Sequence, residues 1–194
     1  MELMIPREDY KNYRMNKGEL YKNKKLDRFL SWETSAGRNM FSIESIDERL
    51  RIAAKFLLDR QNIAVVCSER EKSSAEAFSG LVGARAIPHY KSSLFSNPEN
   101  KDYIEPDAIF ILNCDEHRNV IEEADLNNIP VLAFCNTNSK IDGLDLVVPL
   151  NVTNRNAIRI ALWLIANEIL RAKGQKPVLL EGFGKEEQSD EDLE

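Results

Sequence analysis

The chain has 194 residues, of which 43% are hydrophobic, and its 26 basic and 32 acidic residues give a net charge of −6. This length suits one domain with terminal segments, and such a domain buries about 70% of its unfolded surface. No uncharged run reaches the roughly 18 residues that cross a bilayer, which excludes a membrane span. The first twenty residues mix charges of both signs and lack the apolar core of a signal peptide. We therefore expect a cytoplasmic protein.

Charge is distributed unevenly along the chain. Residues 175–194 contain seven acids and two lysines, and residues 1–174 then carry 24 basic and 25 acidic residues. We interpret 175–194 as an acidic, disordered tail, because it lacks the apolar residues that order a segment. Residues 7–28 hold eight cations against four acids, and 1–39 shows no clean hydrophobic period. We interpret 1–39 as a basic N-terminal arm that orders on binding, with a possible short helix over 25–32.

The predicted domain, residues 40–174, begins with a short alternating strand over 40–44. Ser45 and Glu48 then have the spacing of a capping box in front of a predicted helix over 47–60. In this helix Leu50, Ala53 and Leu57 recur at steps of three and four residues, which builds one apolar stripe. The stripe predicts that the helix packs on a sheet.

The remaining elements alternate between strands and helices. Continuous apolar runs predict strands that are covered on both faces, and an apolar stripe or a closing glycine marks the helices after them. The predicted strands are 62–68, 84–88, 108–113, 131–135 and 144–149, and the predicted helices are 73–82, 117–127 and 154–173. Parallel neighbours need right-handed crossovers, so this order predicts a doubly wound α/β sandwich. A long polar loop separates the second and third of these strands, and loops of this length are usually functional.

A catalytic site at the carboxyl edge of the sheet is the first alternative for function. Ligands bind at this edge in doubly wound folds, and Cys67, Cys114 and Cys135 each end an apolar run there. Asp115 and His117 follow Cys114, so a thiol, a carboxylate and an imidazole stand close in sequence. The neighbouring carboxylates would raise the pKa of the thiol, however, and oppose a nucleophilic thiolate. We favour three reduced, buried cysteines.

Nucleotide and metal sites receive less support. The turn after strand 62–68 reads SEREKSS, with two glutamates and no glycine where a pyrophosphate would lie. The eight glycines form neither of the common phosphate-loop motifs. The chain has two histidines without metal-ligand spacing and no CxxC pair, so we predict no cofactor. Nucleic-acid binding is the third alternative, because the arm places Tyr10, Tyr13, Tyr21 and Trp32 among its cations.

Six blocks of the sequence together point to one family. They read DERLRIAAKFL, GARAI, SNPENKDYIEPD, NIPVLAFCNTNS, LDLVVPLN and ALWLIANEILR. In order and spacing they resemble the archaeal and eukaryotic branch of the small-subunit ribosomal protein S2 family, whose eukaryotic member is the laminin-receptor-like ribosomal protein. The resemblance covers 41–174. It includes Pro106, Glu123 and Pro130 around the Cys114 stretch, whereas Asn113, Cys114 and Asp115 replace the Asp-Pro-Arg step of relatives.

The resemblance implies a flavodoxin-like three-layer sandwich, with a mainly parallel sheet of about five strands and without the coiled-coil insert of the bacterial branch. It implies a structural constituent of the small ribosomal subunit, without enzymatic activity, that acts in translation on the cytoplasmic ribosome. Its partners would be small-subunit ribosomal RNA and neighbouring ribosomal proteins, with no membrane and no small-molecule substrate. The residues that we predict to bind RNA are Lys17, Lys22, Lys24, Lys25, Arg28, Arg38, Lys91 and Arg155.

Two other functions stay open at this point. One is a small-molecule or nucleotide-binding enzyme of the same fold that uses the Cys114 edge. The other is an interaction module that works away from the ribosome. Each predicted RNA-binding cation is also compatible with an exposed, solvated charge, because lysine at a surface carries no sequence information. Asn97 and Asn151 lie in the matched blocks, where they suit the organisation of turns.

Overall fold

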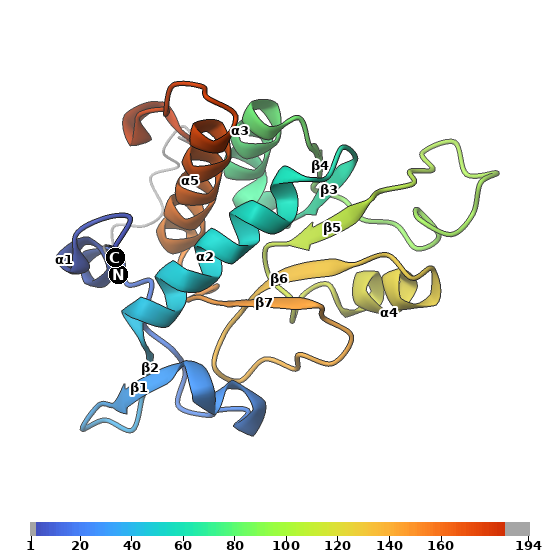
Figure 1. The fold of residues 1–194 in the computed structure, drawn as a ribbon. Coiled ribbons are helices and arrows are strands. Elements are labelled where there is room, and N and C mark those ends of the chain that lie inside the picture. Colours follow the sequence, from blue (N-terminus) through green and yellow to red (C-terminus); the bar gives the residue numbers. More distant parts are fainter. Residues whose placement is uncertain (1–2, 185–194) are drawn as a thin grey trace.

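The computed structural model describes residues 3–184. Within them a five-stranded parallel sheet forms the centre of the molecule, with the strand order β4-β3-β5-β6-β7 (Figure 1). The strands are β3 (Ile63–Val66), β4 (Arg85–Ile87), β5 (Ala108–Ile111), β6 (Val131–Cys135) and β7 (Leu146–Pro149). This is the flavodoxin-like order, in which the chain reverses direction across the sheet between β3 and β5. The predicted fold class is confirmed.

The strands form where the sequence has continuous apolar runs. Every residue of β3, β5, β6 and β7 is buried. Phe110 of β5 lies between two other rings, at 5.8 Å from Phe78 and 4.9 Å from Phe134, and both pairs are edge-to-face. Such pairs add roughly 0.5–1.5 kcal/mol to the burial of their area. The core therefore sits on both faces of the sheet, as the unbroken apolar runs predicted.

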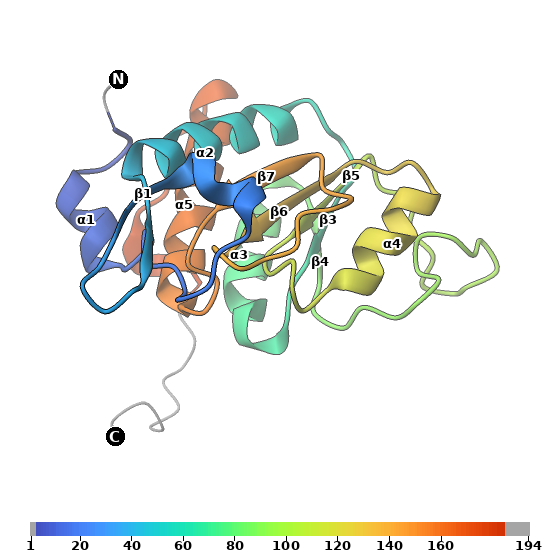
Figure 2. The ribbon, with the colours of Figure 1, turned by 90° about the horizontal axis from the view of Figure 1, so that it is seen from below.

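Helices cover the sheet on both faces and complete three layers. On one face α2 (Ile43–Leu58), α5 (Arg155–Ala172) and α3 (Lys72–Val82) lie side by side, and α4 (Arg118–Leu126) covers the other face (Figures 1 and 2). α3 ends at Gly83, whose φ of +83° is the left-handed conformation predicted there. Within residues 3–184, no helix is long and apolar enough to span a bilayer.

The start of α2 differs from the prediction. The predicted strand 40–44 is shorter, because β2 (Asn39–Phe41) ends before Ser42. Ser42, and not Ser45, is the N-cap, and its hydroxyl accepts a hydrogen bond from the Ser45 amide at 3.3 Å. The earlier start places Ile43 and Ile46 on the buried face of the helix with Leu50. β2 leads directly into α2, so no helical hairpin separates them.

Residues 3–39 pack against the domain. They form α1 (Arg7–Asn12), the short 3₁₀ helix η1 (Lys24–Phe29) and β1 (Leu30–Glu33), which pairs antiparallel with β2. Tyr10 is fully buried, and its hydroxyl donates to Oδ1 of Asp47 at 2.7 Å. The short helix expected over 25–32 is present in part as η1, with Leu26 and Phe29 buried, whereas residues 30–32 belong to β1. The tertiary contacts order this segment without a partner; the division of the chain at residue 39 stays a prediction.

The segment after α5 returns along the same helix. Asn167 forms two hydrogen bonds with the backbone of Val178, and the Trp163 indole donates to the Val178 carbonyl at 2.7 Å. Phe183 is also buried. The first part of the predicted tail is therefore held on α5 at Val178, and it returns to the domain again at Phe183. Residues 185–194, which carry most of its acids, lie outside the described residues, so the solvated tail stays a prediction.

Candidate nucleic-acid interface

The carboxyl edge of the sheet, where folds of this class bind ligands, holds the three cysteines as predicted. Cys67, Cys114 and Cys135 are free and fully buried. Burial raises the pKa of the Cys67 thiol to about 12, with a further contribution from Glu71. Burial also raises the pKa of Cys135 far above its ordinary value, and the adjacent Cys114 adds to the effect. Both environments oppose the thiolate that a nucleophilic cysteine needs.

Asp115 and His117 do not form a catalytic arrangement with Cys114. The Asp115 carboxylate accepts a hydrogen bond from the Ser139 hydroxyl, so it faces the loop after β6. His117 is the N-cap residue of α4, and burial lowers its pKa and favours the neutral imidazole. The Nε2 atom of His117 has no hydrogen-bond partner among the described residues. A triad requires a base that is oriented by a third group, and this geometry lacks that contact.

A segment of the chain itself covers the same edge. We call residues 13–25 the N-terminal strap; it follows α1 and leads into η1 (Figure 2). The Glu19 amide donates to Oγ1 of Thr137 at 2.8 Å, and the Asn23 amide donates to the Thr137 carbonyl at 2.7 Å. At the next strand, Nδ2 of Asn151 donates to the Arg14 carbonyl at 2.9 Å. The strap therefore covers the carboxyl ends of β6 and β7, on the same edge of the sheet as the cysteines.

The turn after β3, at the point where the strand order reverses, is acidic. Glu71 is buried and accepts a hydrogen bond from the Ser68 hydroxyl. Arg70 contacts Glu71 at 3.1 Å and Glu116 at 3.6 Å, so its charge is already compensated. A phosphate site at this position would offer glycines and free backbone amides. This turn presents carboxylates, which repel a phosphate.

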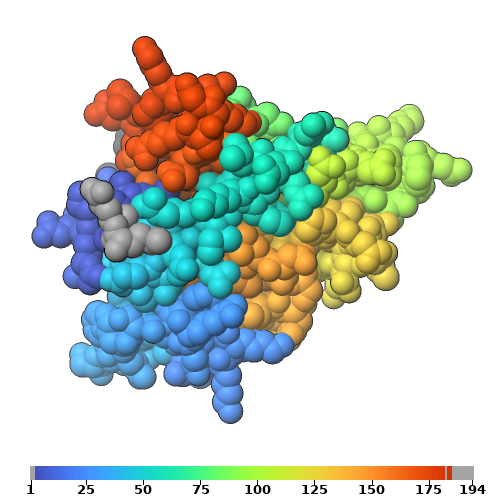
Figure 3. Space-filling view, viewed as in Figure 1, coloured from blue at the N-terminus to red at the C-terminus, as the bar shows by residue number. Residues whose placement is uncertain are grey.

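The predicted RNA-binding cations fall into two regions. Six of the eight lie in the strap, in η1 or in the β1–β2 hairpin, and we call residues 13–41 the N-terminal lobe, which forms one side of the molecule (Figure 3, blue). Arg155 opens α5 next to Asn154, whose Nδ2 donates to the Tyr13 carbonyl at 3.3 Å. Lys91 belongs to the loop before β5, which projects on the far side of the molecule (Figures 1 and 3). The structure therefore does not bring Lys91 to the other cations.

Several of these cations already have carboxylate partners. The ion pairs are Lys22 with Asp27 at 3.1 Å, Lys25 with Asp142, Arg38 with Glu19 at 3.5 Å, and Lys91 with Asp102 at 3.8 Å. Within residues 3–184, Lys17, Lys24 and Arg28 have no carboxylate at ion-pair distance. Exposed ion pairs contribute only about 0–1 kcal/mol, so a phosphate can compete for the paired cations as well.

The four aromatic side chains among the predicted cations differ in exposure. Tyr21 is 80% exposed and Trp32 is 57% exposed, as a surface for stacking requires. Tyr10 is fully buried against Asp47, and Tyr13 is partly buried in the core. The suggestion that all four aromatics stand among the cations is wrong for Tyr10, because its ring belongs to the core. Arg49 joins the cations instead, since its guanidinium lies 4.9 Å from the Phe29 ring.

Comparison with known proteins decides the family. The family model for ribosomal protein S2 matches residues 89–172. The small ribosomal subunit protein uS2 of Saccharolobus solfataricus is 33% identical over 177 residues, which cover 89% of this chain and 77% of that protein. This chain belongs to the ribosomal protein S2 family. The uS2 protein of Thermofilum pendens is 31% identical over 180 residues, with 91% of this chain and 84% of that protein covered.

A third S2 relative is longer than this chain. The uS2 protein of Haloquadratum walsbyi is 33% identical over 177 residues, and the match covers 89% of this chain but 63% of that protein. The match to all three relatives extends well before residue 89, where the family model begins. These relatives are archaeal, so the expectation of an archaeal-type S2 family member is confirmed.

In this S2 family member, the projecting loop is anchored on α4 by Glu123. Oε1 of this buried carboxylate accepts from the Phe95 amide at 2.9 Å and from the Ser96 hydroxyl at 2.7 Å. Oε2 accepts from the Ser93 amide at 3.1 Å and from the Tyr90 hydroxyl. Burial opposes ionisation, but the four hydrogen bonds outweigh it and hold the pKa of Glu123 below its ordinary value. Asn97 organises the next turn, because its Oδ1 accepts from the Glu99 amide.

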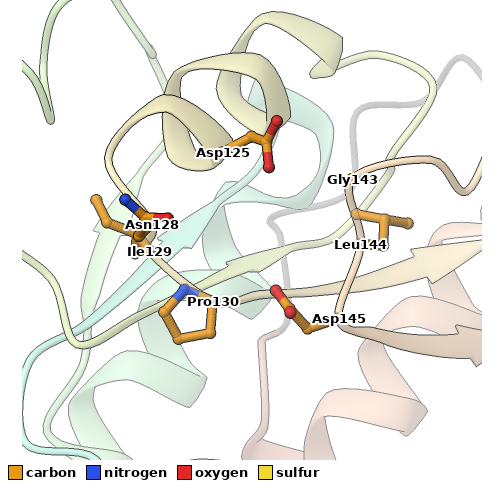
Figure 4. A pocket seen from close by; sticks show the side chains of 7 residues that line it. All are labelled: Asp125, Asn128, Ile129, Pro130, Gly143, Leu144 and Asp145. Carbon is orange, nitrogen blue, oxygen red and sulfur yellow. The ribbon is translucent and has the colours of Figure 1, made fainter.

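A small pocket of the S2 domain lies at the opposite edge of the sheet, between the end of α4 and the start of β7 (Figure 4). The carboxylates of Asp125 and Asp145 approach it from two sides. Asp145 is held in place because its Oδ2 accepts from the Val131 amide at 2.8 Å. The lining carboxylates make this pocket unsuitable for phosphate.

Proposed function

We propose that this chain is a structural constituent of the small ribosomal subunit, without catalytic activity, that works on the cytoplasmic ribosome. The observation that carries the proposal is the match to proteins named small ribosomal subunit protein uS2 along about nine tenths of the chain. The filled carboxyl edge of the sheet supports a non-enzymatic role, because the strap takes the place of a substrate.

The proposed contacts with ribosomal RNA come from the N-terminal lobe. Lys17, Lys24 and Arg28 have no carboxylate partner within residues 3–184, and the exposed rings of Tyr21 and Trp32 offer stacking surfaces nearby in the chain. Cations seek backbone phosphates, whereas aromatic rings accept unpaired bases. The remaining surface is then available to neighbouring ribosomal proteins.

Sedimentation of cell extracts through sucrose gradients tests the ribosomal role. The protein is expected to co-migrate with small subunits at low salt and to dissociate in part at high salt, because phosphate contacts release counterions. Absence from the small-subunit fractions at low salt would contradict the proposal. A triple variant with Lys17→Gln, Lys24→Gln and Arg28→Gln should dissociate from small subunits at a lower salt concentration than the wild type. A control variant with Lys55→Gln, Arg60→Gln and Arg85→Gln should dissociate at a higher salt concentration than that triple variant.

The enzyme alternative at the Cys114 edge is tested separately. Cys114→Ala removes a fully buried thiol, and growth and polysome profiles should stay unchanged when the protein is structural. Thiol-specific reagents should modify the folded protein slowly at Cys67, Cys114 and Cys135, because all three are buried and burial raises the pKa of Cys67 and Cys135. A loss of activity in the translation of a defined message, with normal sedimentation of Cys114→Ala, would favour a chemical role.

A further inference from the structure

Two arginines from different elements lie against one aromatic ring. The guanidinium carbon of Arg28 is 4.7 Å from the centroid of Phe29, and that of Arg49 is 4.9 Å from the same centroid. Phe29 is the last residue of η1 and is 4% exposed, while Arg49 belongs to α2. η1 and the first turns of α2 are neighbours in both Figure 1 and Figure 2. The two guanidinium carbons are therefore separated by no more than the sum of their distances from the ring centroid, and they lie on either side of or along the same ring.

Among the described residues, neither of these two arginines forms an ion pair. Several other arginines of the protein contact carboxylates, as Arg51 does with Asp47 at 2.9 Å and Arg70 with Glu71 at 3.1 Å. In residues 3–184, no carboxylate lies within ion-pair distance of Arg28 or Arg49. Asp27, which directly precedes Arg28 in the sequence, pairs with Lys22 at 3.1 Å instead.

The charge of Arg28 also acts on the guanidinium of Arg49. Burial lowers the pKa of Arg49, and the charge of Arg28 lowers it further, against the opposing effect of Glu48. Two like charges near a partly buried ring repel one another in a medium that screens them less than water does. An anion shared by both guanidinium groups would remove this repulsion.

We propose that Arg28 and Arg49, held on the ring of Phe29, form a binding site for one phosphodiester group. Because a guanidinium offers its N–H donors in a planar fork, each arginine can bind a phosphate through two parallel hydrogen bonds. The ring supports one face of each guanidinium and leaves its N–H edge available. The identification of the ligand as a backbone phosphate of ribosomal RNA rests on the proposed function, whereas the existence of an anion site rests on the geometry of the two arginines.

Nucleic acid fits this site better than an acidic protein segment. Lys24, in the same short helix as Arg28, has no carboxylate partner in the described chain, and Tyr21 of the preceding strap is 80% exposed. Closely spaced cations with an exposed ring suit a polymer that alternates phosphates and bases. A carboxylate peptide offers no base for the ring.

The first experiment measures the affinity of the full chain for small-subunit ribosomal RNA across a series of salt concentrations. The variants are Arg28→Gln, Arg49→Gln and the double variant. Arg60→Gln is the matched control, because Arg60 stacks alone on Phe56 at 5.2 Å. Each single variant and the double variant should lower the slope of log affinity against log salt by the same amount, about one counterion. The reason is that all three variants lose contact with the same phosphate, which both arginines bind. Arg60→Gln should leave the slope unchanged.

Conservative variants and a small ligand separate the site from general charge. Arg28→Lys and Arg49→Lys keep the charge but lose the fork, so each should bind RNA about fivefold more weakly, as expected for one lost hydrogen bond. In the free protein, titration with inorganic phosphate should shift the side-chain NMR signals of Arg28 and Arg49 together. The signal of Arg60 should not move, and Arg49→Gln should abolish the shift of Arg28. Equal unfolding midpoints of the variants exclude loss of structure.

The outcomes separate the two proposals. The phosphate site is overturned when the double variant loses twice the slope of each single variant, when Arg60 responds to phosphate as Arg28 does, or when an acidic peptide competes as well as RNA at equal ionic strength. A wild-type protein that fails to sediment with small subunits, but in which phosphate shifts Arg28 and Arg49 together, overturns the ribosomal role and retains the site. Co-sedimentation of the wild-type protein with small subunits, together with unchanged salt slopes for RNA binding in all three variants, overturns the phosphate site and retains the ribosomal role.

Discussion

Gly18 of the strap lies directly against Thr137 at the end of β6. A Cβ atom at residue 18 would stand 2.2 Å from Cγ2 of Thr137 and 2.8 Å from the Asn39 carbonyl oxygen. The strap thus approaches the sheet so closely that only a hydrogen fits at this position. This contact joins the N-terminal lobe to the edge of the sheet that would otherwise receive a ligand.

Gly18→Ala should therefore destabilise the protein by about 1–3 kcal/mol, because the methyl group forces the strap away from Thr137. Urea unfolding at constant pH measures the change. Gly80→Ala is the control: it lies within α3 with nothing within 4 Å of an added Cβ, so it should stabilise by about 0.5–1 kcal/mol. A Gly18→Ala protein as stable as the wild type would show that the strap does not hold this position in solution.

Tyr10→Phe tests the attachment of α1 to the domain. The Tyr10 hydroxyl donates to Asp47, which is 1% exposed and also accepts from the Met4 amide at 2.8 Å. Hydrogen bonds to charged groups contribute about 1.5–3 kcal/mol, so the loss of this donor should lower the free energy of unfolding by about this amount. Tyr21→Phe changes an 80% exposed residue and should have almost no effect. Equal losses from both variants would contradict a buried Tyr10–Asp47 contact.

Glu123→Gln tests the anchor of the projecting loop. The amide keeps the shape of the side chain but presents N–H groups to donors, so we expect a loss of about 2–3 kcal/mol. Glu122→Gln, at the exposed neighbouring position, should have little effect on the same urea transition. A loop released without global unfolding would appear as faster proteolysis between residues 91 and 102, and its absence would contradict the anchor.

The lowered pKa of Glu123 also predicts how stability depends on pH. The folded protein holds this pKa below the ordinary value of 4.5. Its contribution is therefore complete above that value and is lost as the pH falls through the lower, folded pKa. Unfolding free energies measured from neutral to acid pH should converge for the wild type and Glu123→Gln. A constant difference between the two proteins down to the lowest pH would contradict this linkage.

Asn167→Ala tests whether segment 176–184 is held on α5. Asn167 forms two of the three hydrogen bonds of Val178, at 2.7 Å from its amide and 3.1 Å from its carbonyl oxygen, and the Trp163 indole forms the third. Removal of this side chain leaves the Val178 amide without its partner, so chymotrypsin should cleave after the neighbouring, exposed Leu179 several-fold faster. Asn156→Ala, at an exposed position in the first turn of the same helix, is the control. Equal cleavage rates in the two variants would show that Trp163 alone retains the segment.

The sheet could be predicted from the sequence because its signals are local. Buried parallel strands require continuous apolar runs, and runs such as 63–66 and 108–111 appear unbroken in the chain. The end of α3 was equally local, since Gly83 supplies the left-handed residue that ends the helix. The start of α2 was misplaced because Ser42 and Ser45 are both competent caps; burial of Ile43 and Ile46 decides between them.

The candidate site depended on contacts that no local pattern reports. Lys17, Lys24 and Arg28 were predicted from charge alone, and charge could not distinguish them from Lys22 and Lys25, whose carboxylate partners the fold supplies. Arg49 was missed because it belongs to a helix whose solvated face carries charges of both signs. Its neighbour Arg28 is twenty-one positions earlier in the chain, and only the ring of Phe29 brings them together.

The sequence by itself determined the S2 family, the fold class implied by that family and the buried state of the cysteines, because these follow from composition, periodicity and matched blocks. Tertiary structure alone decided that the strap closes the carboxyl edge of the sheet, as the 2.7 Å bond from Asn23 to Thr137 shows. The physical reason is distance along the chain: hydrogen bonds and charge pairs between remote segments depend on how the layers pack, and hydrophobic periodicity carries no information about them.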